Sequence, residues 1–321
     1  MKQDTSFLLS VLLFFCLYFS SCERRELTYF SAAQITISAD WSRAGLNDQE
    51  QNYGATAVFY PVCGGKPILV LMGDRKETVV RLGEGLYDVI LFNRSFDDFG
   101  EIAFRGEDRY RTLEAYGTTA ESPDELAADR MERFEVTPGM LGNYAPAPKT
   151  RGLVAEDDSC HLCFTPEKLT KEITALIRIK GMNNIRTATC TLSGVSESIF
   201  LASGQSSEKT LTQEFTLRNP VFLPGSLTEG TMSATFSVFG FDETIRHDLH
   251  LNALLVDGKT RFEESFDNVK ISRADNIDGT FTIIIDLTCT KTIPNVKVEG
   301  GSGLDADVDD WPDEEDTDVN I

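Results

Sequence analysis

Histidine, tryptophan and basic residues are scarce in this chain. Its 321 residues include 3 histidines and 2 tryptophans, and 30 Lys and Arg stand against 51 Asp and Glu. The net charge of −21 argues against nucleic acid as a partner, because phosphates are bound by a basic footprint. With so few histidines, and no carboxylate pair that the sequence places in one pocket, catalytic groups are not visible. We therefore expect a protein that is not an enzyme and that holds no cofactor.

The chain also lacks a hydrophobic run long enough to cross a bilayer, which takes about 20 residues. Its longest apolar run, Phe7 to Phe19, follows Lys2 and is followed by two serines. This is the pattern of a secretory signal, which we assign to residues 1–21. Cys22 comes next and is the residue that a lipoprotein pathway acylates, although Phe19 stands where the strictest motif has an aliphatic residue. The alternative is an ordinary signal peptide followed by a chance cysteine.

If Cys22 carries acyl chains such as palmitate, they hold the protein at a membrane by its first mature residue. Each buried methylene contributes about 0.8 kcal/mol, so several chains together give a stable anchor. We expect an outer-membrane location, with the fold facing either the periplasm or the cell surface.

Cysteines suited to disulfides or metal are few. Export permits disulfides, but the five cysteines beyond Cys16 and Cys22 are an odd number. The cluster Cys160-His161-Leu162-Cys163 is read as an extended segment. A redox pair would need a helix N-terminus to lower the thiol pKa, and zinc would need two more ligands, for which only His247 and His250 are available. We expect few or no structural disulfides and no metal at this cluster.

Alternation of apolar and polar residues with a period of two dominates the chain and predicts half-buried strands. Turns rich in Gly, Asn, Asp and Pro separate them, as at Asp257-Gly258. One helix is predicted from Ser122 to Phe134, where a capping box precedes apolar residues at helical spacing. The predicted strands are 35–41, 57–62, 68–72, 78–82, 86–93, 102–105, 173–180, 186–192, 211–218, 231–239, 248–256, 260–266 and 281–290.

This pattern predicts an all-β protein with two tandem Greek-key β-sandwiches. A segment that alternates proline with small residues, residues 146–152, is typical of an extended linker. We therefore place the N-terminal sandwich at 22–145 and the C-terminal sandwich at 153–293.

Residues 294–321 form a glycine-rich hinge and an acidic tail. From Glu299 to Asp318 there are ten Asp or Glu and no Lys or Arg. Asp305, Asp307 and Asp309 have the spacing of the start of a calcium loop, but Asp310 occupies the place where such a loop needs glycine. They are weak candidates for a metal site, and a solvated tail is the simpler interpretation.

Several strings, taken in their order along the chain, resemble the fimbrillin-like lipoproteins of Bacteroidetes, a family that includes domains of unknown function. They are Ser21-Cys22-Glu23-Arg24-Arg25-Glu26-Leu27, Ala39-Asp40-Trp41-Ser42, residues 82–93, Leu192-Ser193-Gly194-Val195, Phe239-Gly240-Phe241, residues 255–259 and Val308-Asp309-Asp310-Trp311.

The resemblance implies two transthyretin-like sandwiches, export as a lipoprotein, and a structural or adhesive role in a pilus. Fimbrial subunits of this family assemble by strand exchange: a protease cuts after an arginine, the first strand leaves, and a partner's extended segment fills the groove by β-augmentation. Arg43, just past the first strand, would be that site here. The alternative is that this strand stays in place.

Two other functions stay open from the sequence. One is a surface lipoprotein that binds a glycan or a peptide, and the other is a structural module stabilised by calcium.

Overall fold

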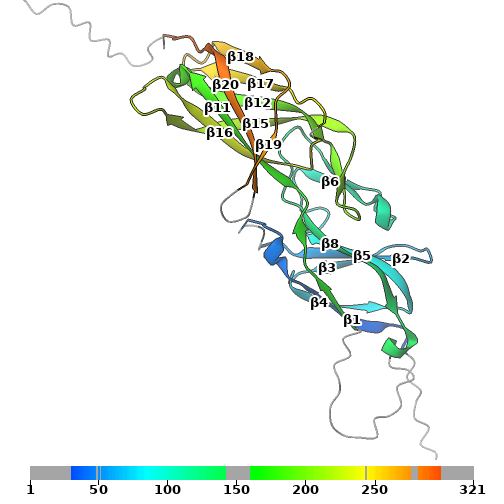
Figure 1. Cartoon of the computed structure of the whole chain (residues 1–321). Coiled ribbons are helices and arrows are strands. Elements are labelled where there is room, and N and C mark those ends of the chain that lie inside the picture. Colours follow the sequence, from blue (N-terminus) through cyan, green and yellow to red (C-terminus); the bar gives the residue numbers. More distant parts are fainter. Residues whose placement is uncertain are drawn as a thin grey trace, which may run out of the picture.

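The computed structural model describes residues 30–47, 50, 52–141, 160–242, 244–275 and 281–297. Within these ranges the chain is built from β-strands arranged as two sandwiches that lie end to end (Figure 1). The predicted all-β class and tandem sandwiches are confirmed. No helix in the described ranges is long and apolar enough to cross a membrane. Short 3-10 helices occur at connections: η1 (Trp41–Arg43), η3 (Tyr110–Thr112), η4 (Pro138–Leu141) and η6 (Met182–Asn184).

The first sandwich packs a three-stranded sheet, in the order β4-β1-β9, on a five-stranded sheet, in the order β10-β8-β5-β2-β3. Side chains from both sheets form one core, in which Ile35 and Ile37 of β1 are fully buried. The strands are β1 (Ala33–Ala39), β2 (Ala55–Pro61), β3 (Ile68–Met72), β4 (Glu77–Leu82), β5 (Gly85–Asn93), β8 (Ala127–Val136), β9 (His161–Phe164) and β10 (Glu167–Lys168).

The second sandwich is a continuous ladder of eight strands, in the order β18-β17-β12-β15-β16-β11-β20-β19. β15 pairs with β12 through its first half and with β16 at its end, so it passes from one layer to the other. Phe215 and Phe236 stack in the core with ring centroids 4.1 Å apart. The strands are β11 (Lys171–Lys180), β12 (Ile185–Ser196), β15 (Thr210–Phe222), β16 (Glu229–Val238), β17 (Leu249–Leu255), β18 (Arg261–Phe266), β19 (Ser272–Asp275) and β20 (Phe281–Thr292).

A third, four-stranded sheet joins the two sandwiches. Its order is β14-β13-β7-β6, so strands from the first half of the chain pair with strands from the second, and Ile199 lies opposite Ala115. A separate core, which includes Phe92, Ile199 and Phe239, lies beneath it. β2 and β5 are therefore buried on both faces, which explains their nearly continuous apolar sequence. The strands are β6 (Ile102–Arg105), β7 (Glu114–Gly117), β13 (Ser198–Phe200) and β14 (Gln205–Ser206).

The helix predicted from Ser122 to Phe134 is wrong, because residues 127–136 form strand β8. Met131 and Phe134 lie three residues apart yet both pack on the first core. The cause is a β-bulge: Tyr87 pairs with Phe134 but Val89 pairs with Met131, so β8 holds one extra residue. Arg133 in the bulge has a φ of 59°, and its N–H donates to Asp88 at 2.9 Å. The bulge gives a strand the spacing of a helix.

The strand pairing also differs from the predicted limits of the second sandwich. The linker at 146–152 lies outside the described residues. The segment after it, which we assigned to the second sandwich, instead completes the first: β9 pairs in parallel with β1, and β10 pairs with β8. The ladder of the second sandwich begins only at β11, Lys171.

Candidate functional site

The first strand, β1, is held between two strands that do not pair with each other. It runs antiparallel to β4 on one side and parallel to β9 on the other. Ala33, Ile35, Ile37 and Ala39 all point into the first core. Removing β1 would leave a slot between β4 and β9 whose floor is apolar and whose two walls have unpaired backbone groups. Such a slot can accept only another extended segment.

The turn that follows β1 is fixed by local contacts. The Asp40 carboxylate accepts a hydrogen bond from the Ser42 N–H at 3.0 Å and caps η1. That N–H also holds the pKa of Asp40 below its ordinary value. The Trp41 indole N–H donates to the Arg75 carbonyl at 2.8 Å, and the Arg75 guanidinium lies 5.3 Å from the ring centroid.

Arg43, the predicted maturation residue, ends η1. Its side chain is 70% exposed and lies 3.8 Å from Glu167, which is equally exposed. The next residue, Ala44, is fully buried, and its N–H donates to the Trp41 carbonyl. A protease can therefore reach the arginine side chain, but the peptide bond after it enters a cleavage site only after η1 opens.

A buried ionic cluster lies in the first sandwich. The Arg94 guanidinium binds the buried Glu50 carboxylate through Nη2 and through Nε at 3.0 Å, and binds Asp124 at 3.2 Å. It also lies 4.4 Å from the centroid of Tyr53 and 5.1 Å from that of Phe99. The Arg94 backbone has a φ of 62°, a strained conformation for a residue with a side chain. The cluster fixes the loop between β1 and β2 to the end of β5.

A second ionic cluster lies where the two sandwiches meet. Arg105 of β6 binds both oxygens of Glu114 on β7 at 2.7 Å, and it lies 3.5 Å from Glu197 of the second half. The Ser198 hydroxyl donates to Glu114. The hydrogen bonds from Arg105 hold the pKa of Glu114 below its ordinary value. This contact ties the sandwiches together with charge as well as with the shared sheet.

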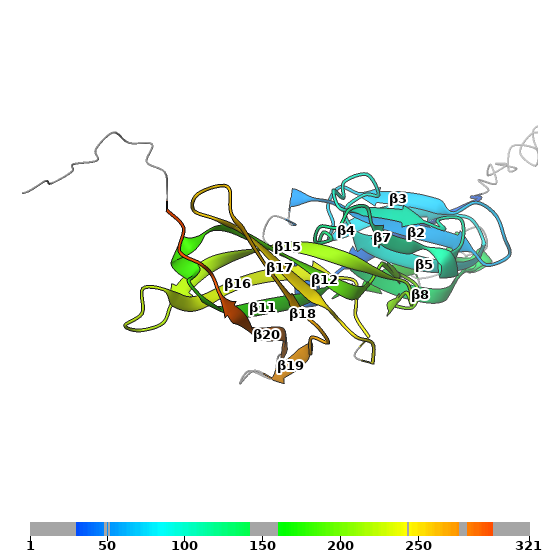
Figure 2. The same cartoon turned by 90° about the horizontal axis from the view of Figure 1, so that it is seen from above.

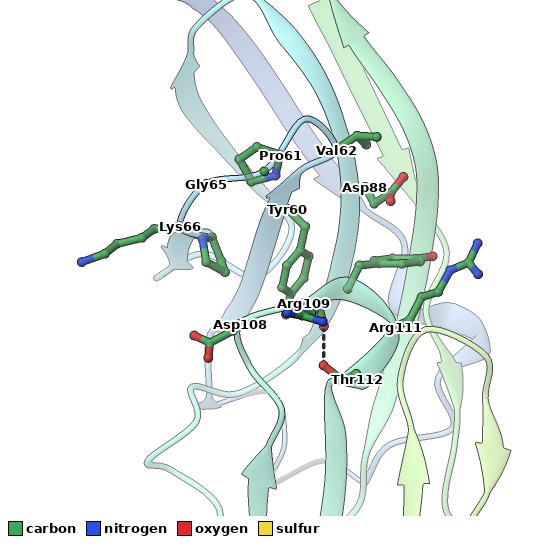
Figure 3. Close-up of a pocket in the computed structure, with 13 residues that line it drawn as sticks. Tyr60, Pro61, Val62, Gly65, Lys66, Asp88, Asp108, Arg109, Arg111 and Thr112 are labelled. Carbon is green, nitrogen blue, oxygen red and sulfur yellow. Dashed lines mark hydrogen bonds between the residues drawn. The ribbon is translucent and has the colours of Figure 1, made fainter.

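An open cavity of about 750 Å³ lies between the end of β2 and η3 (Figure 3). Tyr60 of β2 faces the η3 segment that carries Arg109 and Arg111, while Lys66 extends to the opposite side from Arg111. The rings of Tyr60 and Tyr110 meet edge to face with centroids 6.0 Å apart. Burial raises the pKa of both hydroxyls, in Tyr110 to about 12. Because both tyrosines are almost fully buried, the groups that the cavity presents for binding are the basic and acidic side chains of its lining.

The cysteine and histidine residues considered above for metal are not brought together. Cys160 and Cys163 lie at β9 in the first sandwich and are free thiols. Both ring nitrogens of His247 are within hydrogen-bond distance of backbone carbonyls, those of Ser193 and Asp242. No group of three or more metal-ligating side chains occurs in the part of the chain that the structure describes. The predicted sites at Cys22, Asp305, Asp307 and Asp309 lie outside that part.

The chain is similar to known proteins in family, in sequence and in structure. Residues 21–216 match the family described as "Domain of unknown function (DUF5119)". A protein of Bacteroides ovatus described as a fimbrium anchoring subunit, Fim4B, is 24% identical over 205 residues, which are 63% of this chain and 58% of the relative. The chain thus spans less than two thirds of that relative's length.

Among solved structures, one described as an adhesin from Bacteroides ovatus superposes with a TM-score of 0.54 at 19% identity. The match covers 77% of this chain and 87% of the other. This similarity shows the fold.

Proposed function

This chain belongs to the DUF5119 family, and from that premise we propose that it is a structural or adhesive subunit of a bacterial surface fimbrium, without catalytic activity. The similarity to a fimbrium anchoring subunit makes the anchoring role the specific form of this proposal. In that role the lipid on Cys22 holds the protein at the outer membrane, and the sandwiches carry the contact to the next subunit.

The observation that carries the proposal is the direction of the chain through the two sandwiches. β9 leads directly through β10 into β11, so the start of β1, which is parallel to β9, lies at the outer end of the first sandwich. β20 is parallel to β11, and the Ile293 N–H donates to the Lys180 carbonyl at the outer end of the second. The two ends of the described fold therefore lie at opposite ends of an elongated body (Figure 1, Figure 2). This arrangement suits a spacer between a membrane and an assembly.

The test of this role is a strain that lacks the gene, complemented with the wild-type chain or with Cys22→Ser. With wild type, fimbriae should stay on the cells in electron micrographs. With Cys22→Ser, the protein should leave the membrane fraction and fimbriae should be shed into the medium. Cys63→Ser, at an exposed cysteine, is the matched control and should behave as wild type. Normal cell-bound fimbriae in the deletion strain would contradict the proposal.

Arg43 offers a second maturation state for the same fold. A cut after Arg43 would separate Cys22 and β1 from the rest of the chain, so a persistent lipid anchor and a completed strand exchange exclude each other in one molecule. The buried Ala44 supports the uncut form as the resting state. Sequencing of the N-terminus of native material separates the two: a start at Cys22 indicates the anchor, and a start at Ala44 indicates a subunit whose slot receives a partner strand.

The cavity beside η3 supports a second candidate, capture of a glycan or peptide by the same surface protein. Its exposed basic side chains, Lys66, Arg109 and Arg111, are residue types that hydrogen-bond to such ligands. A glycan array probed with wild type and with Arg109→Ser tests it. Hits that the variant loses would favour ligand binding. An array without hits would count against ligand binding, and the structural role would then be the one proposal that remains.

A further inference from the structure

Strand β3 forms one edge of the five-stranded sheet and carries only aliphatic side chains and methionine. Its sequence is Ile-Leu-Val-Leu-Met, and β2 is its one partner among the described strands. The side chains of Leu69 and Leu71 are 50% and 61% exposed. One row of backbone N–H and C=O groups on this strand therefore faces outward beside two exposed leucines.

The other edge strands of the described sheets are protected in ways that β3 is not. Edge strands usually carry charged or polar side chains, which prevent pairing with another chain. Each of the other edge strands exposes at least one polar or charged side chain. The exception is β6, in which no residue is fully exposed. The exposed polar and charged groups are Glu77 and Arg81 on β4, His161 on β9, Glu167 on β10, Arg261 and Glu263 on β18, Arg273 on β19 and Gln205 on β14. Among the edge strands that the structure describes, only β3 exposes aliphatic side chains alone.

The chemistry of this edge defines its occupant. Unpaired backbone groups in a row bind an extended strand, because only a strand repeats donors and acceptors at the same spacing. Leu69 and Leu71 call for apolar side chains on that strand. A partner strand with charged side chains at these positions would place those charges against the leucines, partly desolvated and without an opposite charge.

A second copy of β3, running antiparallel, is an extended strand with apolar side chains at the required positions. When Val70 lies opposite Val70 of a second molecule, Leu69 lies opposite Leu71 and Ile68 opposite Met72. Beyond the strand, Lys66 then lies opposite Asp74, and two-fold symmetry repeats this pairing of opposite charges at the other end.

We propose that β3 is a self-association edge: two copies of this chain pair through antiparallel β3 strands centred on Val70, and their five-stranded sheets become one continuous sheet. Leu69 and Leu71 of the two copies then pack side by side on one face of the joined sheet, which reduces their exposure to water. The net charge of −21 opposes the approach of two copies at long range. Assays should therefore run near 0.15 M salt, where the screening length is about 8 Å.

Analytical ultracentrifugation over a range of concentrations tests the edge. Wild type should show a concentration-dependent dimer. Leu71→Lys places two charges in the pairing strand and should raise the dissociation constant at least about tenfold. The matched control is Val79→Lys on β4, a strand edge that already carries Glu77 and Arg81, at a valine that is 57% exposed. It should leave the dissociation constant unchanged. Circular dichroism and urea midpoints establish that both variants are folded.

Cysteine crosslinking tests the register in a chain with Cys63, Cys160 and Cys163 changed to serine. Val70→Cys should give a disulfide-linked dimer, since opposed residues of antiparallel strands have Cα atoms about 4.5–5.5 Å apart, within disulfide range. Leu69→Cys, which lies opposite Leu71 and not opposite itself, should give no disulfide-linked dimer under the same oxidation.

Three results would overturn the proposal. They are a wild type that stays monomeric at all concentrations, equal effects of Leu71→Lys and Val79→Lys, or crosslinking through Leu69→Cys in place of Val70→Cys. A monomer that binds an apolar peptide at β3 would show that the edge is used by a different partner. None of these outcomes bears on the anchoring role, which the Cys22 variants test separately.

Discussion

Arg94→Met should destabilise the first sandwich strongly, because it leaves the Glu50 carboxylate buried without its cation. Glu50 is 2% exposed, and its two oxygens accept bonds from Arg94. Breaking a buried pair by removing one partner typically costs about 3–5 kcal/mol. Asp124 would stay satisfied, because the N–H groups of Gly100 and Glu101 each donate to it at 2.8 Å.

Urea unfolding followed by far-UV circular dichroism reports on both sandwiches. With a slope of about 2–3 kcal/mol per molar urea, the midpoint of Arg94→Met should fall by about 1–2.5 M. The matched control is Arg178→Met, which removes an equally bidentate bond to Asp286 from a pair whose side chains are 53% and 46% exposed. An exposed pair contributes about 0–1 kcal/mol, so its midpoint should change little.

A double variant separates the buried charge from simple loss of packing. Adding Glu50→Gln to Arg94→Met replaces the unpaired carboxylate with a neutral amide and should recover a large part of the lost stability. If Arg94→Met costs no more than Arg178→Met, or if Glu50→Gln recovers nothing, the buried cluster does not stabilise the fold in the way we argue.

Three further outcomes are expected. Gly106→Ala should lower the thermal midpoint of unfolding by more than Gly225→Ala. Both glycines have positive φ, but a Cβ at Gly106 would collide with the Thr112 carbonyl, whereas that at Gly225 meets nothing within 4 Å. The stability contributed by Glu114 should be present above its ordinary pKa of 4.5 and lost as pH falls through its lower folded value, so Glu114→Gln should flatten that acid loss in urea titrations. Maleimide labelling of the folded chain should be fast at the exposed thiols of Cys63 and Cys163. Cys190 and Cys289 are buried, and burial raises their thiol pKa, so they should be labelled only after unfolding.

The strands were predictable where the chain alternates without interruption. In β11, for example, Ile173, Ala175, Ile177 and Ile179 are buried as their spacing indicates. The prediction failed at β8, where the bulge at Arg133 shifts the alternation by one residue. The short strands β7, β9, β10, β13, β14 and β19 were missed because two to four residues rarely establish a period, although β6, of four residues, was predicted.

The candidate site was predictable only where its signal is local. Arg43 was predicted from the family resemblance and from its place just after a strong strand, and it stays a prediction. The contacts of Glu50 with Arg94 span 44 residues and those of Glu114 with Ser198 span 84. Such pairs leave no periodic pattern, because folding alone brings them together. The sequence likewise showed β3 as a strand without showing that it lies at an edge.

The first strand and the last strand each pair in parallel with a neighbouring strand, and this has a mechanical consequence. β1 lies parallel to β9 and β20 lies parallel to β11, with the start of the one and the end of the other at opposite ends of the body. A tensile force between those ends acts along both strands. The backbone hydrogen bonds that join each strand to its neighbour are then loaded together in shear and do not open one after another. The force at which the chain extends is then governed by a high barrier to unfolding and not by equilibrium stability. In the proposed anchoring role, this arrangement of strands would let the protein withstand the pull of flow.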